Sequence, residues 1–168
     1  MSVKWKTTKN DFPSMERSIK DFKGKKVNVG HLDGGEQAWL AGIHEYGCKI
    51  TVTPKMRAWL HAHGLHLKPS TTVITIPERS FLRAGFDKYH EEVINKCEKA
   101  LGEALIEGNT EQFLEFVGQL LRDKIADYAT DEVNTPAKHP FSLEMNPGKT
   151  NPLVITGDMI AALTYEVE

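Results

Sequence analysis

Two runs of apolar residues at helical spacing, separated by a two-residue stop, constrain the fold of this 168-residue chain more than any other feature. From Glu78 to Glu107 and again from Thr110 to Tyr128, apolar side chains recur every three or four residues, which predicts one apolar face on each of two long helices. Gly108-Asn109 ends the first helix, and Thr110 is the expected N-cap of the second. The apolar positions are Leu82, Phe86, Tyr89, Val93, Cys97, Leu101 and Leu105, then Phe113, Phe116, Val117, Leu120, Leu121, Ile125 and Tyr128.

Four segments with strand character accompany the two helices. Val27 to Leu32 alternates apolar and polar residues, and so does Thr164 to Val167 near the carboxyl end. Ile50 to Thr53 and Thr72 to Ile76 are rich in β-branched residues, and each is followed by a proline, which cannot continue a strand ladder. Because an antiparallel helix pair must bury its inner face, we expect an α+β fold in which two long antiparallel helices cover a mainly antiparallel sheet.

Four shorter helices are predicted from residue spacing and from start and stop signals. Near the amino end, Met15, Ile19 and Phe22 share one face of a short amphipathic helix. The other three are Glu36 to Tyr46, stopped by Gly47; Lys55 to His63, stopped by Gly64; and Asp158 to Leu163, capped by Thr156.

The chain is expected to form one domain over residues 1–168, because this length and 40% hydrophobic residues suit a single core. Residues 1–24 are its N-terminal segment. Residues 48–76 are predicted to project as an excursion, since a short helix interrupts the two β-branched runs. Residues 134–152 hold four prolines, and we expect a loop there because proline resists both helix and strand.

Charge and cysteine content narrow the function classes. Lysine and arginine total 21 against 23 aspartate and glutamate, so a net charge of -2 provides no long-range field to gather nucleic acid or membrane. Cys48 and Cys97 are the only cysteines and form no CxxC motif, which favours folding in a reducing cytoplasm. The amino terminus lacks a signal-peptide pattern, and no apolar run reaches the roughly 18 residues of a membrane helix. We therefore expect a soluble protein.

Two histidine segments leave a metal-dependent hydrolase open as an alternative. His44-Glu45 begins like the HExxH zinc motif, but the second histidine is missing. His61, His63 and His66 are close in sequence and could chelate a metal in principle. Residues two apart lie on different faces of a helix, however, so we predict no metal site, no cofactor and no catalytic residue.

Six residues are candidates for contacts with a partner or with other copies of the chain. Trp59 is expected at an interface because large aromatic residues are enriched there. Near it, Lys55, Arg57 and Arg79, together with Arg83, would form a basic edge facing DNA or an acidic partner, unless they are ordinary surface cations neutralised by Glu78 and Asp87. Phe141 and Leu143 complete the set, because long loops in compact domains are usually functional or disordered. A DNA-binding regulator is a second alternative, with a steep salt dependence of affinity.

Three motifs, in order, resemble the phage tail-completion and virion-morphogenesis proteins, a family of head-tail joining or neck proteins of long-tailed phages and prophages. They are AWLAGIHEYG at residues 38–47, IPERSFLRAGFD at 76–87 and NPLVITGDMIAALTYEV at 151–167. A fourth stretch, ITVTPKMRAWLH at 50–61, is similar to the Mu-like branch of the family. Family members often carry proline where Ser80 stands and aspartate where Ile155 stands.

The resemblance implies a structural protein of the virion that is not an enzyme. It implies a homo-oligomeric ring, a hexamer, at the head-tail junction, assembled in the host cytoplasm. The implied partners are head-completion and tail-terminator or tail-tube proteins, with DNA passing through the lumen without sequence readout and with no membrane contact. Such a ring closes through a heterologous interface, for which the excursion at 54–70 and the loop at 138–152 are the candidate surfaces.

Overall fold

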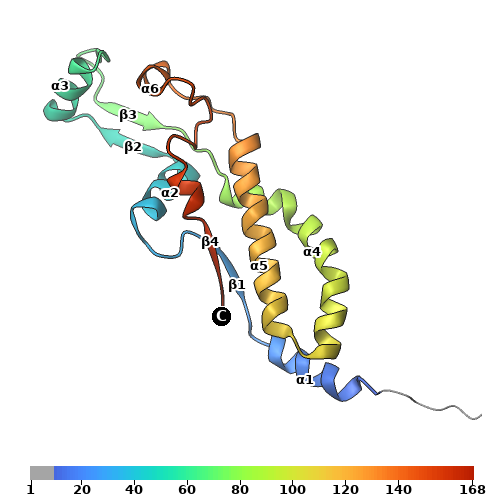
Figure 1. Ribbon diagram of the computed structural model, residues 1–168. Coiled ribbons are helices and arrows are strands. Elements are labelled where there is room, and N and C mark those ends of the chain that lie inside the picture. The colour runs from blue at the N-terminus through green and yellow to red at the C-terminus, as the bar shows by residue number, and fades with distance from the viewer. Residues whose placement is uncertain (1–9) are drawn as a thin grey trace, which may run out of the picture.

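The computed structural model of the chain describes residues 10–168, so the first nine residues of the predicted N-terminal segment lie outside the described part. Figure 1 shows an elongated molecule, with a helical pair toward one end and a projecting arm at the other. In chain order the elements are α1 (Phe12–Phe22), β1 (Val27–Gly30), α2 (Glu36–Tyr46), β2 (Cys48–Thr51), α3 (Pro54–Ala62), β3 (Val73–Ile76), α4 (Leu82–Glu107), α5 (Thr110–Asp127), the π-helical turn η1 (Tyr128–Glu132), α6 (Pro140–Met145), α7 (Asp158–Ala161) and β4 (Thr164–Val167).

The two long helices confirm the antiparallel pair predicted from the apolar periodicity (Figure 1). Gly108 ends α4 with a φ of 81°, a left-handed conformation that glycine adopts without strain. Side chains from α4 and α5 pack into one core with side chains from α2, η1 and α7 and from residues next to these elements. The buried core residues are Ala41, Phe81, Val93, Cys97, Leu121, Ile125, Ala129, Val133, Leu153, Met159 and Leu163.

The predicted single sheet is wrong, because the strands form two separate antiparallel pairs. One pair joins β1 to β4, with Val27 opposite Val167 and Gly30 opposite Thr164. The other joins β2 to β3, with Cys48 opposite Ile76. The first pair joins the first and last strands of the described chain, as the predicted sheet requires, while the second lies apart from the helical pair (Figure 1).

Only the β1–β4 pair packs against a long helix. Figure 1 shows both strands running alongside α5. Gly118 of α5 makes this approach possible, since a Cβ atom at that position would overlap the ring of Tyr165 in β4. The helical pair therefore covers the β1–β4 sheet. Among the described residues, no long helix packs against β2 and β3.

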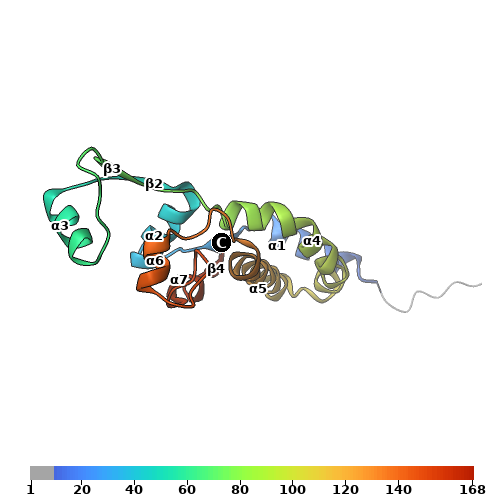
Figure 2. The ribbon, with the colours of Figure 1, turned by 90° about the horizontal axis from the view of Figure 1, so that it is seen from above.

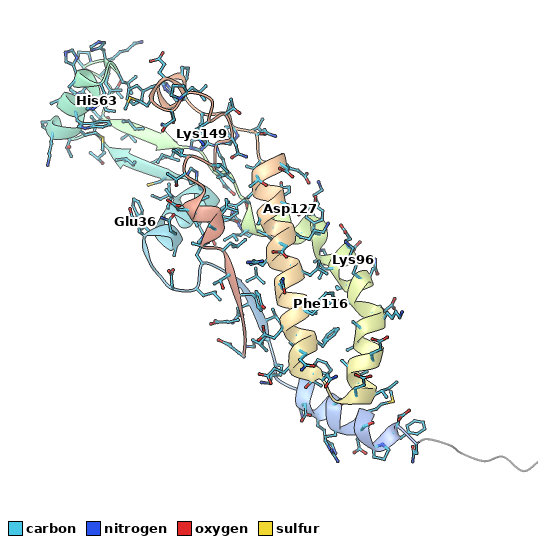
Figure 3. All side chains as sticks on the ribbon, viewed as in Figure 1. Glu36, His63, Lys96, Phe116, Asp127 and Lys149 are labelled. Atoms are coloured by element: carbon cyan, nitrogen blue, oxygen red, sulfur yellow. The ribbon has the colours of Figure 1, made fainter. Side chains whose placement is uncertain are left out.

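Residues 48–76 form the projecting excursion predicted from the sequence, and we call them the arm. β2 and β3 make its stem, and α3 lies at its tip (Figures 1 and 2). Figure 3 shows His63 at this tip and Lys149 of the Pro-rich loop on the same end of the molecule. Arm and loop thus share one end of the fold, and the turn between α4 and α5 lies at the other.

Several element boundaries differ from the predicted ones. The first long helix begins at Leu82 rather than Glu78, and Thr110 is the first residue of α5 while Asn109 precedes it without a side-chain cap. The Pro-rich loop contains the short helix α6, because Pro140 occupies the first helical turn, where proline is tolerated, and His139 accepts a hydrogen bond from the N–H of Phe141. Proline content alone was therefore a poor guide to this segment.

Candidate functional site

A buried carboxylate joins α2 to the start of α4. Glu45, near the end of α2, is 2% exposed. Its carboxylate accepts hydrogen bonds from the backbone N–H groups of Phe81, Leu82 and Arg83 at 2.8, 2.9 and 3.1 Å, and from the hydroxyl of Ser80 at 2.6 Å. The Arg83 side chain closes the network with Nε 2.8 Å from the same carboxylate. We call this network the junction.

The junction replaces the N-cap that the α4 sequence lacks. Phe81 precedes the helix and offers no side-chain oxygen, so the first N–H groups of α4 depend on Glu45 from another helix. A negative charge is also favourable at this positive end of the helix dipole. Burial alone raises the pKa of Glu45, but the hydrogen bonds from Ser80, Arg83 and the backbone outweigh it, and the pKa lies below its ordinary value.

Two buried cations organise the Pro-rich loop: Arg79 holds it beside the junction, and Lys138 joins its two ends. Arg79 donates from Nε to the carbonyl of Pro136 at 2.7 Å and from Nη2 to that of Ala137 at 3.1 Å. Lys138 donates from Nζ to the carbonyls of Lys149 and Val154 at 2.7 and 3.0 Å. Among the described residues neither cation has a carboxylate partner within ion-pair distance, and burial lowers the pKa of each.

A cavity of about 450 Å³ lies between the arm and the Pro-rich loop, and we call it the arm groove. Leu60, Leu65 and Leu67 of the arm form part of its wall, and Phe141 of α6 contributes to the wall as well. Arg79, Lys138 and His44 line it too. The groove is therefore mostly apolar with cations at its base, which suits an apolar segment of another protein better than a small polar substrate.

His44 is held neutral at the base of the arm groove. Burial lowers its pKa, and the nearby charges of Arg79 and Lys138 lower it further. Its Nδ1 atom is buried without a hydrogen-bond partner among residues 10–168. No acid orients this imidazole and no nucleophile bonds to it, so the described contacts do not include a nucleophile-base pair.

The arm is fastened internally by Arg57 and leaves its aromatic residue outside. The Arg57 guanidinium donates to the carbonyls of Leu67, Lys68 and Thr71 at 3.2, 3.0 and 2.6 Å, which ties the loop after α3 back onto that helix. Trp59 stacks on His63 with ring centroids 4.0 Å apart and is 51% exposed. Arg57 is therefore engaged within the arm, whereas Trp59 remains accessible.

The other candidate contact residues fall into two groups. Lys55 is exposed on α3, and Phe141 and Leu143 are half-buried on α6. Arg79 is 7% exposed and occupied within the fold, so it has little surface for a partner. Of the predicted basic edge, Arg57 and Arg79 bind carbonyl groups and Arg83 pairs with Glu45 and Glu78, so these three guanidinium groups have partners within residues 10–168.

The histidine segments do not converge on a metal site. Among residues 10–168 no group of three or more histidine, cysteine, aspartate or glutamate side chains could hold a metal ion. His61 and His66 do meet, with ring centroids 4.3 Å apart, but His63 turns back to the carbonyl of Trp59. Glu45 is occupied at the start of α4, so it is not free to act as the base of a hydrolase.

Sequence reasoning missed both Glu45 and Lys138. A glutamate in a helix usually faces solvent. The donors to Glu45 are mainly backbone N–H groups, which leave no pattern in the sequence. One signal was present: Ser80-Phe81 precedes a long helix that has no aspartate or glutamate in its first turn. Lys138 sits between prolines in a segment whose pattern gives no hint of burial.

A scan against protein-family models finds no match to this chain, and searches of the curated proteins and of the solved structures find no significant match either. Function therefore rests on the residues themselves. No helix among residues 10–168 is both long and apolar enough to cross a membrane.

Proposed function

We propose that this chain is a non-enzymatic structural subunit of a phage or prophage virion, which forms a ring at the head-tail junction. The motifs at residues 38–47, 76–87 and 151–167 support this role through their resemblance to neck proteins. Two of these motifs contain the junction, since Glu45 lies in the first and Ser80 to Arg83 lie in the second. Their polar residues hold the fold together, which suits assembly rather than catalysis.

The observation that carries the proposal is the arm. It projects from the body, and it holds four cations, Lys49, Lys55, Arg57 and Lys68, without a single acidic residue. Trp59 and Val73 are 51% and 45% exposed on it, and the arm groove opens at its base. A monomer gains nothing from exposing these apolar side chains, whereas an interface would bury them.

A closed ring needs two different surfaces on each subunit, one fitting the other. The arm and the body provide two surfaces of different chemistry on one chain. Subunits that join through them form a ring if the rotation closes, and DNA can then pass through the lumen without sequence-specific contacts. The contacts expected above and below the ring are head-completion and tail-terminator or tail-tube proteins.

Native mass spectrometry and negative-stain electron microscopy of the purified full chain test the ring. We expect one closed oligomer, with six copies implied by the family resemblance, and rings in the images. Trp59→Glu should reduce the oligomer to monomers without lowering the melting temperature, because Trp59 is half-exposed. Ile94→Glu is the matched control, since Ile94 is 62% exposed on α4, away from the arm.

A chain that stays monomeric in both measurements would contradict the ring. The position of the encoding gene tests the virion assignment separately. We expect genes for portal, capsid and tail proteins beside it, and particles from a strain that lacks the gene should separate into heads and tails. A metabolic operon around the gene, or intact particles without the protein, would overturn the assignment.

A further inference from the structure

Strand β1 has an open backbone edge. Lys26 and Glu168 exchange both backbone hydrogen bonds at 2.9 Å, and the register then makes Asn28 and Gly30 the next residues bonded to β4. In an antiparallel pair the residues between them point their N–H and C=O groups to the opposite side. Val27 and Val29 therefore direct these groups away from β4, and no described strand pairs with them there.

An apolar groove of about 640 Å³ runs beside this edge, and we call it the strand groove. Val27 and Val29 line it from β1, and the facing wall holds Leu82 and Phe86 of α4 with Leu121 and Ile125 of α5. Phe86 belongs to the apolar stripe predicted from the sequence, yet it is 46% exposed. The helical pair thus offers an apolar surface beside β1, where a third strand would lie.

The arm carries a second open edge, on β3. The backbone N–H of Val52 donates to the carbonyl of Thr72 at 2.8 Å, which makes this a hydrogen-bonded pair of the arm stem. By the same alternation, Val73 and Thr75 of β3 point their N–H and C=O groups away from β2. Residues 71–76 read TTVITI, an uncharged and β-branched edge of the kind that templates pairing with another chain. The outer edge of β2 carries Lys49, a charge that discourages such pairing.

We propose that β3 of one subunit pairs with the open edge of β1 in the next, so that two two-stranded sheets join into one four-stranded sheet across the subunit boundary. The inference rests on the proposed ring and names the contact that builds it. The uncharged edge of β3 and the edge of β1 beside the strand groove are each four residues long and lie on separate elements, which is the arrangement a heterologous interface requires. A second copy is therefore the occupant of the strand groove.

Charge agrees with this pairing. The exposed side chain of Asp87 lies at the strand groove, and the arm that would approach it bears only cations. Arg83, the cation at the groove, is already paired with Glu45 and Glu78. An arm from a second copy would thus meet the Asp87 carboxylate and an apolar wall.

Single proline substitutions distinguish the two edges of one sheet. Val27→Pro removes an outward N–H at the first residue of β1, where proline is tolerated, and leaves the bonds to β4 in place. Val167→Pro is the matched control, because it removes an outward N–H from β4 on the opposite edge. We expect native mass spectrometry to show at least a tenfold loss of oligomer at fixed concentration for Val27→Pro and no loss for Val167→Pro, with unchanged far-ultraviolet circular dichroism for both.

A second pair of variants, at Phe86 and Phe116, changes side chains alone. Phe86→Ser removes an exposed ring from the strand groove, whereas Phe116→Ser removes one that is also 46% exposed but lies outside it (Figure 3). We expect only Phe86→Ser to weaken the oligomer.

Proline variants test the arm in the same way as they test β1. Val73→Pro should abolish assembly, and Thr51→Pro, on the other edge of the arm stem, should not.

The outcomes separate this contact from the ring itself. Rings that persist in both Val27→Pro and Phe86→Ser overturn the strand pairing and leave the ring-forming role intact. Equal losses in Val27→Pro and Val167→Pro, with Phe86→Ser unaffected, also overturn it. A wild-type chain that is monomeric at every concentration overturns both proposals.

Discussion

The junction and the arm show two opposite uses of polar and apolar residues in one small fold. At the junction, Glu45 is nearly inaccessible and every hydrogen bond it makes is to the chain itself. On the arm, Trp59 and Val73 are about half exposed, and the Arg57 side chain ties the loop after α3 back onto that helix. The difference indicates that the junction stabilises the fold, whereas the exposed side chains of the arm are available for the contacts between subunits that we propose.

The comparison predicts unequal effects for two aromatic truncations. Phe81, at the junction, is fully buried, so Phe81→Ala should lower the free energy of unfolding by about 4 kcal/mol through lost burial and a cavity. Trp59→Ala on the arm should change it by less than about 0.5 kcal/mol, because half of the ring already faces water. Urea denaturation of the monomeric fraction measures both, and equal losses would show that the arm is part of the stabilising core.

Removing the junction carboxylate should have the next largest effect. Glu45→Ala leaves the N–H groups of Phe81 and of the first two residues of α4 without acceptors, and we expect a loss of about 3 kcal/mol in the free energy of unfolding. Glu45→Gln should lose less, since its amide oxygen still accepts hydrogen bonds. Glu78→Gln is the control, because Glu78 also pairs with Arg83 but is exposed. A control variant as unstable as Glu45→Ala would mean that Arg83, not α4, is the important partner.

Stability should fall in acid because of Glu45 at the junction and its sequence neighbour His44 at the arm groove. The lowered pKa of Glu45 contributes stability that is present above its ordinary pKa and is lost as the pH falls through the folded value. The pKa of His44 is lower in the folded chain than in the unfolded chain. As the pH falls below 6.5, the unfolded chain therefore binds a proton before the folded chain does, and stability declines. Urea midpoints between pH 8 and pH 4 should therefore decrease, and His44→Asn should flatten the decrease near pH 6. An unchanged profile in that variant contradicts the assignment to His44.

Loosening the arm should have the smallest effect on global stability. Arg57→Ala removes three hydrogen bonds to the loop after α3, yet none of them reaches the body. The free energy of unfolding should change by no more than about 1 kcal/mol, while proteolysis at residues 64–72 should accelerate. Mass mapping of a limited chymotrypsin digest, which can cleave after Leu65 and Leu67, measures this, with Lys55→Ala as the control on the same helix. Faster cleavage throughout the chain would show that arm and body unfold together.

Periodicity predicted the two long helices and the strands but not how all of the strands pair, and it gave no sign of α6. The spacing in α4 and α5 predicted the helical pair, and alternation in Val27 to Leu32 and Thr164 to Val167 predicted two strands that do pair. An alternating pattern shows that a strand has a buried face and does not name its partner, so the separation of β2 and β3 from that sheet could not be foreseen. If the strands join between subunits, the predicted single sheet exists only in the assembly.

The site was harder to predict than the fold because its important contacts are to backbone atoms. Glu45, Arg79 and Lys138 bind N–H groups or carbonyls, which every residue possesses, so their spacing in sequence carries no motif. Trp59 was predicted as an interface residue from its size and type, and its half-exposed position is compatible with that role, which the oligomer measurements will decide.

Hydrogen-deuterium exchange of the assembled and monomeric fractions tests the central claim most directly. The account predicts that the amide protons of Val27 and Val29 in β1, and of Val73 and Thr75 in β3, exchange freely in the monomer and become protected in the oligomer. Amides of Asn28 and Gly30, already bonded to β4, should be protected in both fractions. Equal exchange of the four edge amides in monomer and oligomer would contradict the claim that these strands join the subunits.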